Sequence, residues 1–241
     1  MKGAENMLFN KKIIWNGDSI CAGSRHTGNW ASRIAEKNSM TYKNYAIGGG
    51  TIAEGLPLMR SGNERHSVSA TLDNMYLENP DADYIIIEGG TNDADLLGNA
   101  LMGNSQTRLG TFIPTYFGGD YDRTTFCGAL ESVFYRATKY WMGKKIAFVV
   151  AQKMGTAAIE TDNRRLYFDK AVAICLKWGI PYLDLWNGSY LNPKLEWMYD
   201  PSKTPDENRD ENKGFYIDGQ HLTSRGYDFT ADILDSWLKT L

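Results

Sequence analysis

The sequence predicts an α/β protein in which a parallel sheet lies between two layers of helices. Short apolar segments alternate with longer segments of helical periodicity along almost the whole chain. The apolar segments are near-continuous runs, which is typical of strands covered on both faces. Strands that alternate with helices form parallel sheets. Because 241 residues suit one good-sized domain, we expect a single doubly wound domain over residues 1–241.

Five segments are predicted to be strands, four of them markedly apolar and one, 40–48, more polar. They are residues 11–16, 40–48, 83–90, 144–152 and 180–186.

Five segments have helical periodicity: residues 28–38, 66–78, 124–142, 160–178 and 223–240. The last is the best marked, because Thr223 or Ser224 can cap its first turn and apolar residues recur behind the cap at helical spacing.

Two stretches interrupt the alternation and are predicted to be insertions. Residues 94–123 are rich in glycine, and residues 187–217 are polar with scattered aromatic side chains. Long loops in compact domains are commonly functional. Within the second insertion, the charge run at 205–213 predicts a solvated loop.

Composition excludes several classes of function. A net charge of −3 argues against nucleic-acid binding, which needs a clustered basic face. No apolar run approaches the roughly 20 residues of a membrane span. The first residues lack the apolar stretch of a secretory signal, so we expect a cytoplasmic protein, or a secreted one if a signal has been removed. The oligomeric state is left open.

No metal site or disulfide framework is expected. The three cysteines, Cys21, Cys127 and Cys175, are widely spaced and are expected to be small buried thiols. Acidic residues and histidines do not cluster at metal-ligand spacing.

Polar and small residues follow the first three predicted strands. Gly17-Asp18-Ser19 follows the first, Gly48–Gly50 the second, and Asn92 the third. Ligands of an open parallel sheet bind beyond the carboxyl ends of its strands. We therefore expect these residues to share one edge of the sheet.

A fourth element lies late in the chain, where Asp218 and His221 stand three residues apart before the last helix. An imidazole can take the proton of a serine hydroxyl, and a carboxylate on its other nitrogen fixes the tautomer. Ser19, His221 and Asp218 therefore supply a nucleophile, a base and an orienting acid.

Donors for an oxyanion are also present. The Ser19 N–H at a helix start, one glycine N–H from 48–50 and the Asn92 amide can serve. Taken singly, these residues have simpler uses, since serine caps helices, glycines form turns and Asn92 can cap a turn. Asp18 is expected to be structural, and His66 is expected to be a surface residue at a helix start.

The four blocks together resemble those of the SGNH hydrolases, also called the GDSL esterase/lipase family. Gly17-Asp18-Ser19-Ile20 is similar to the first block, residues 44–49 to the second, residues 90–93 to the third and residues 218–221 to the fifth. The blocks occur in the family's order between residue 13 and about residue 227. Ile20 replaces the family's usual leucine.

This resemblance implies a flavodoxin-like three-layer α/β/α sandwich and ester hydrolysis through an acyl-enzyme. It implies that Ser19, Asp218 and His221 are catalytic and that Ser19, Gly49 and Asn92 form the oxyanion hole, although the triple glycine leaves the choice among Gly48, Gly49 and Gly50 open. No cofactor is implied. The elbow of the larger Gly-x-Ser-x-Gly hydrolase class is excluded, because Cys21 stands where its second glycine would be.

The expected substrates are short acyl or acetyl esters, including those of carbohydrates. Six aromatic residues in or directly beside the two insertions are expected to build a shallow site for them: Tyr116, Phe117, Tyr121, Trp186, Trp197 and Tyr199. Two alternatives stay open. One is a lysophospholipase or thioesterase, and the other is a catalytically silent carbohydrate-binding protein on the same scaffold.

Overall fold

The computed structural model describes residues 7–23, 27–55, 66–94, 107–155 and 163–241. Its centre is a five-stranded sheet in which every neighbouring pair is parallel, in the order β2-β1-β3-β4-β5. The strands are β1 (Lys12–Asn16), β2 (Thr41–Asn44), β3 (Tyr84–Glu88), β4 (Lys145–Val150) and β5 (Tyr182–Asp184). The predicted parallel sheet is confirmed, and its strand order is that of flavodoxin.

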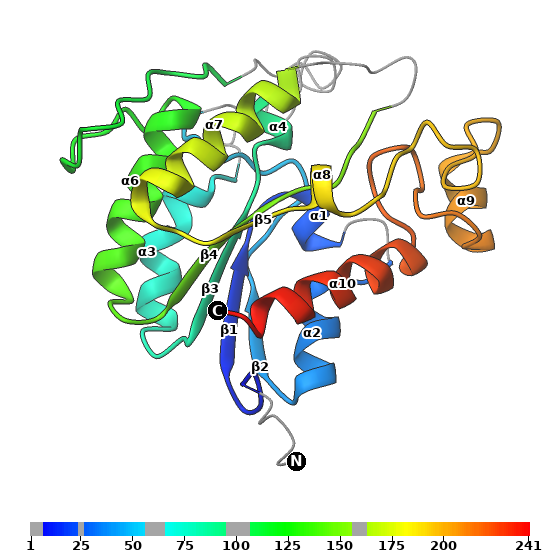
Figure 1. Cartoon of the computed structure of the whole chain (residues 1–241), viewed down its shortest axis with the longest axis horizontal. Coiled ribbons are helices and arrows are strands. Elements are labelled where there is room, and N and C mark those ends of the chain that lie inside the picture. The colour runs from blue at the N-terminus through cyan, green and yellow to red at the C-terminus, as the bar shows by residue number, and fades with distance from the viewer. Residues whose placement is uncertain (1–6, 24–26, 56–65, 95–106, 156–162) are drawn as a thin grey trace.

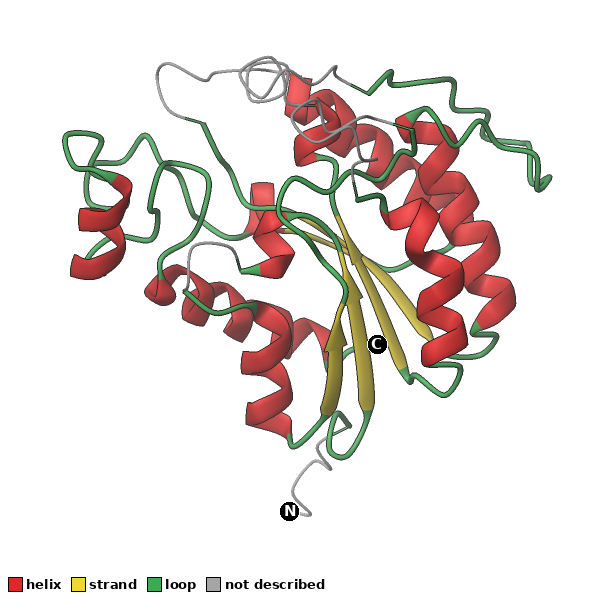
Figure 2. Cartoon of the chain, turned by 180° about the vertical axis from the view of Figure 1, so that it is seen from behind, coloured by secondary structure: helices red, strands yellow, loops and turns green. Residues whose placement is uncertain are grey.

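Helices cover both faces of the sheet (Figure 1). On one face lie α2 (Trp30–Asn38) and α10 (Ser224–Leu238); on the other lie α3 (Val68–Glu78), α6 (Phe126–Tyr140) and α7 (Asn163–Trp178). Seen from behind, the twisted strands run between these two layers (Figure 2). The three-layer α/β/α sandwich is therefore confirmed. None of the described helices is long and apolar enough to cross a membrane.

Three short helices lie at the carboxyl ends of strands. They are α1 (Ser19–Ala22) after β1, α4 (Thr91–Ala94) after β3 and α8 (Leu185–Gly188) after β5. In Figure 1 they lie at the upper end of the sheet. This edge is where the sequence places the candidate site.

The inner strands are buried on both faces, as their continuous apolar runs predict. All five residues of β3 are buried, and the apolar residues of β1 are fully inaccessible to solvent. The edge strand β2 is mostly exposed, which explains its more polar sequence. The three cysteines are free and buried, as predicted.

Two buried polar contacts join α2 to α10. The Trp30 indole N–H donates to Thr230 Oγ1 at 2.8 Å, and the Asn38 amide donates to Asp235 Oδ1 at 2.7 Å. Thr223 caps α10 by accepting from Gly226 N at 3.1 Å. The two contacts hold α10 against α2, and the cap fixes the start of α10, next to which the candidate His221 lies.

The prediction of a loop at 205–213 is wrong in part. The segment contains α9 (Pro205–Glu211), although most of its residues are exposed. Thr204 and Glu207 form a reciprocal capping box, Pro205 occupies the first turn and Asn212 ends the helix in a left-handed conformation. Local capping therefore outweighs the high charge of the segment.

The Trp30–Thr230 hydrogen bond gives a test of the packing between α2 and α10. Replacing Thr230 with Val leaves a buried indole N–H without its acceptor, so we expect the free energy of unfolding to fall by about 1–3 kcal/mol. Urea denaturation measures the change. Thr138→Val is the matched control, because the Thr138 hydroxyl bonds only to carbonyls of its own helix. Equal losses in the two variants would contradict the expectation.

Candidate active site

The turn after β1 presents Ser19 as the first residue of α1. Asp18 caps this helix, with its Oδ1 accepting from Ile20 N at 2.8 Å. Ser19 is 5% exposed, and its backbone N–H has no acceptor among the described residues. The side chain of Asp18 is thus structural, as predicted, and Ser19 retains a spare donor at a helix start.

Asp218 and His221 form a rigid pair in the loop before α10. Asp218 Oδ1 accepts from the backbone N–H of Gln220 at 3.1 Å and of His221 at 2.8 Å. Asp218 Oδ2 lies 2.9 Å from His221 Nδ1. The carboxylate thus sets both the turn and the orientation of the imidazole.

The loop is held over the sheet by residues from two other elements. Gln152, just after β4, donates to Gln220 O at 3.0 Å, and Gly155 N donates to Gly219 O at 3.0 Å. Arg164 in α7 donates to Gln220 Oε1 at 3.0 Å. These contacts return a distant part of the chain to the edge of the sheet.

His221 and Ser19 come together at this edge. His221 Nε2 lies 2.9 Å from Ser19 Oγ. Because Nδ1 faces a carboxylate, it carries the ring hydrogen, and Nε2 is left to accept from the serine hydroxyl. The His221 and Asp218 side chains are 14% and 20% exposed. The structure therefore brings together the three residues that the sequence nominates as a catalytic set.

The glycine turn after β2 narrows the choice of oxyanion donor. Gly50 N donates to Ile47 O at 2.9 Å and is therefore engaged. Gly49 has a φ of 80°, which favours glycine, and its N–H has no acceptor among the described residues. Asn92 Nδ2 donates to Gly50 O at 2.9 Å. The Asn92 amide is thus held against the turn that contains Gly49.

Asp93 fastens the same turn to α4. Its Oδ2 accepts from Ile52 N at 2.8 Å and its Oδ1 from Ala53 N at 3.2 Å, and the side chain is fully buried. The carboxylate therefore fixes the segment after the glycines relative to Asn92.

The expectation that His66 is a surface residue is wrong. It precedes α3 by two residues, but its ring is half-buried, and Nε2 lies 3.1 Å from Asn16 Oδ1. Burial lowers the pKa of His66. A Cβ added to Gly50 would lie 3.1 Å from the His66 ring, so this histidine packs behind the glycine turn. The third histidine, His26, lies outside the described residues.

Sequence reasoning did not single out Glu88, the last residue of β3. It is fully buried, and its Oε2 accepts from Asp18 N at 3.1 Å. The available signal was a lone acid at the end of an otherwise apolar strand, next to the strand that leads to Ser19.

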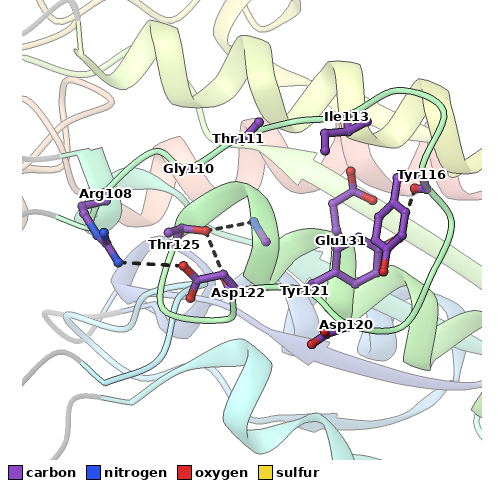
Figure 3. Close-up of a pocket in the computed structure, with 11 residues that line it drawn as sticks. Arg108, Gly110, Thr111, Ile113, Tyr116, Asp120, Tyr121, Asp122, Thr125 and Glu131 are labelled. Atoms are coloured by element: carbon purple, nitrogen blue, oxygen red, sulfur yellow. Dashed lines mark hydrogen bonds and ion pairs between the residues drawn. The ribbon is translucent and has the colours of Figure 1, made fainter.

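The predicted aromatic site is wrong in its composition. Tyr116 and Tyr121 line a pocket of about 320 Å³ beside the start of α6 (Figure 3). Phe117 makes an edge-to-face contact with Trp178, and Trp186 makes one with Phe168. The pocket is lined by none of the residues nominated for catalysis: its walls are Arg108, Gly110, Thr111, Ile113, Tyr116, Asp120, Tyr121, Asp122, Thr125, Gly128 and Glu131.

Of the remaining aromatic residues, Tyr199 lies near the catalytic set. It is largely buried, and burial raises its pKa, with the nearby Asp218 charge raising it further. Trp197, two positions earlier, is 65% exposed. Within the described ranges, no group of three or more His, Cys, Asp or Glu side chains is placed to hold a metal ion.

Comparisons with known proteins bear on the family and on the fold of the chain. The model of the GDSL-like Lipase/Acylhydrolase family matches residues 16–229. No curated protein matches the chain. Among solved structures, a protein from Lactobacillus plantarum has a TM-score of 0.70 at 20% identity, over 96% of this chain and 98% of that one.

Two similar structures carry names that state an activity. An acetyl xylan esterase has a TM-score of 0.60 at 19% identity and covers 95% of this chain and 100% of its own. A carbohydrate acetylesterase family member from Sinorhizobium meliloti has a TM-score of 0.60 at 13% identity and covers 95% of this chain and 98% of its own. At these identities the likeness shows the fold alone.

The family match extends over most of the chain and includes the four sequence blocks from which the resemblance was inferred. The expected family and enzyme class are thereby confirmed: the chain belongs to the GDSL-like lipase/acylhydrolase family and is a carboxylic ester hydrolase.

Proposed function

We propose that this protein hydrolyses short acyl esters, in particular acetyl esters of carbohydrates, with Ser19 as the nucleophile. The observation that carries the proposal is the continuous chain of hydrogen bonds from Asp218 through His221 to Ser19 Oγ. Each of these three side chains would perform one part of an acyl transfer.

His221 Nε2 takes the proton from Ser19 Oγ as the oxygen attacks the ester carbonyl carbon. Asp218 stabilises the imidazolium that forms and keeps its ring in place. A tetrahedral intermediate results, in which the former carbonyl oxygen carries the negative charge.

Three donors stabilise that oxyanion: the Ser19 N–H, the Gly49 N–H and Asn92 Nδ2. The two backbone donors have no other acceptor among the described residues, and Asn92 is fixed against the glycine turn by its bond to Gly50 O. Donors held in place before the reaction need no rearrangement as the charge develops.

Collapse of the intermediate releases the alcohol, which receives its proton from His221 Nε2, and leaves the acyl group on Ser19. A water molecule, deprotonated by the same nitrogen, then attacks the acyl-enzyme and regenerates the serine. No cofactor enters this sequence.

Two observations support a small acyl group on a large polar alcohol. The Asp218 and His221 side chains are partly exposed, so the base lies close to the protein surface, where a bulky alcohol can remain in solvent. Two proteins of the same fold are named as acetyl esterases of carbohydrates.

Replacing Ser19 with Ala removes the nucleophile. We expect kcat/KM for p-nitrophenyl acetate to fall by about 10³-fold or more, with the melting temperature little changed. Labelling with a fluorophosphonate probe, followed by peptide mapping, should mark Ser19 in the wild type and nothing in the variant. Unchanged hydrolysis and no labelling of folded wild type would instead favour a silent carbohydrate-binding protein.

Replacing Asn92 with Ala removes one oxyanion donor. We expect kcat to fall about 10²–10³-fold while KM changes little, because the lost interaction is made mainly in the transition state. Steady-state kinetics with p-nitrophenyl acetate measure the split. A rise in KM at constant kcat would mean that Asn92 binds the ground state instead.

A panel of p-nitrophenyl esters of increasing chain length tests the substrate class. We expect the highest kcat/KM for acetate, a decline towards long chains, and release of acetate from acetylated xylo-oligosaccharides. Wild type and Ser19→Ala are compared on every ester. A maximum at long acyl chains, or turnover of acyl thioesters alone, would favour the lysophospholipase or thioesterase alternative.

A further inference from the structure

Two carboxyl groups meet beneath the turn that presents Ser19. Glu88 ends β3 in register with the residue that follows β1, since Asn16 pairs with Ile87. A Cβ added to Gly17 would lie 2.5 Å from Glu88 Oε2. Glycine at this position therefore lets the Glu88 side chain pass directly under the turn, where its Oε2 accepts from Asp18 N at 3.1 Å.

Each of the two carboxyl groups has one oxygen that accepts a backbone hydrogen bond and one that does not. Asp18 Oδ1 accepts from Ile20 N, and Glu88 Oε2 accepts from Asp18 N. Asp18 Oδ2 and Glu88 Oε1 are buried and make no hydrogen bond with the described residues. Since Glu88 Oε2 contacts the backbone of Asp18, the two carboxyl groups lie in neighbouring positions, and one proton shared between them would give both oxygens a partner.

Electrostatics decide where that proton sits. Burial raises the pKa of Glu88 well above its usual range and the adjacent Asp18 charge raises it further, although backbone N–H groups of Asp18 and Cys21 lower it. Burial also raises the pKa of Asp18, but the bond from Ile20 N, the Thr91 hydroxyl and the Glu88 carboxyl act against that rise. Asp18 therefore holds the charge and Glu88 the proton.

The other titratable groups around the pair do not supply a positive partner to Glu88. The Cys21 thiol is buried, and burial raises its pKa well above the usual range, with the charges of Glu88 and Asp18 adding to the rise. The same is true of the Tyr227 phenol from α10, whose pKa burial raises. The Arg33 guanidinium lies over the Tyr227 ring, 5.6 Å from its centroid.

We propose that Glu88 is a positioning residue that stays protonated at neutral pH and donates a hydrogen bond from Oε1 to Asp18 Oδ2. Its carbonyl oxygen, Oε2, accepts from Asp18 N at the same time. The two bonds clamp the Gly17-Asp18 peptide to β3 and hold Ser19 at its distance from His221. This role rests on Ser19 being the nucleophile, whereas the protonation state of Glu88 does not.

Protonation of Glu88 leaves the buried Asp18–Glu88 pair with a single negative charge. With Glu88 neutral, the pair carries one negative charge, on Asp18, which favours the imidazolium that His221 becomes during the reaction. A second charge on Glu88 would repel Asp18 in a buried environment and push the turn away from β3.

Two substitutions of Glu88 distinguish the effect of its hydrogen bonds from the effect of its side-chain packing. In Glu88→Gln an amide N–H replaces the acid proton and the amide oxygen replaces Oε2, so we expect kcat to stay within about threefold of the wild type. Glu88→Leu removes both bonds, and we expect kcat to fall about 10–100-fold with KM little changed, because a small misplacement of the nucleophile is costly. Equal losses in the two variants would overturn the positioning role.

The protonation state is tested without catalysis. The unfolded chain releases the Glu88 proton near pH 4.3, whereas the folded protein keeps it. Raising the pH from 5.5 to 6.5 should therefore increase the ratio of wild-type to Glu88→Gln unfolding constants about tenfold. Glu36→Gln, at an exposed glutamate of α2, is the matched control and should show no such change. A ratio that is independent of pH would overturn the proposal.

Infrared spectroscopy provides a second measurement on the native protein. The wild-type-minus-Glu88→Gln difference spectrum at pH 7 should contain the carbonyl stretch of a protonated carboxylic acid, and its absence would also overturn the proposal. If Ser19→Ala retained activity, the proposed nucleophile would fail, but the unfolding and infrared results would still decide whether Glu88 holds a proton.

Discussion

The 2.9 Å contact between Ser19 Oγ and His221 Nε2 joins segments that lie 202 positions apart in the chain. The length of this contact depends on the two segments that hold its residues in place. Ser19 is fixed by β1, in the interior of the sheet, and His221 by the loop that precedes α10. The Tyr227 hydroxyl of α10 donates to Ile20 O at 2.7 Å within the core and so ties the two segments together. The catalytic geometry is thus a consequence of how the last helix docks.

Buried carboxyl groups fix the backbone at this edge of the sheet. Asp18 and Asp93 accept from backbone N–H groups, and Glu88 does the same beneath the nucleophile. Each bond satisfies a donor in a turn that has no regular secondary structure to do so. By contrast, Asp218 is partly exposed and is the acid that contacts the imidazole. The fully buried acids thus bond to the backbone around the site, whereas the partly exposed acid also contacts the imidazole of His221.

Sequence periodicity predicted the strands, the sheet and the long helices because each buries a continuous apolar face. The site residues could be nominated since parallel strands end at one edge, and the resemblance supplied their roles. Glu88 was missed because its position depends on strand register. The burial of His66 was missed because it depends on tertiary contacts of its ring with Asn16 and the glycine turn. The helix α9 was missed because capping outweighed charge. The predicted aromatic site grouped residues because they lie in or beside the same loops. In the folded protein these side chains make separate tertiary contacts and do not form one site.

The central claim is that Ser19 carries the acyl group between the two halves of the reaction. Trapping of that intermediate tests it most directly. Wild-type protein mixed with p-nitrophenyl acetate, quenched in acid within the first turnover and digested, should yield one acetylated peptide, modified at Ser19. The peptide should be absent when Ser19→Ala is treated in the same way. An acetyl group found reproducibly on another residue, or turnover with no covalent adduct at any quench time, would contradict the account.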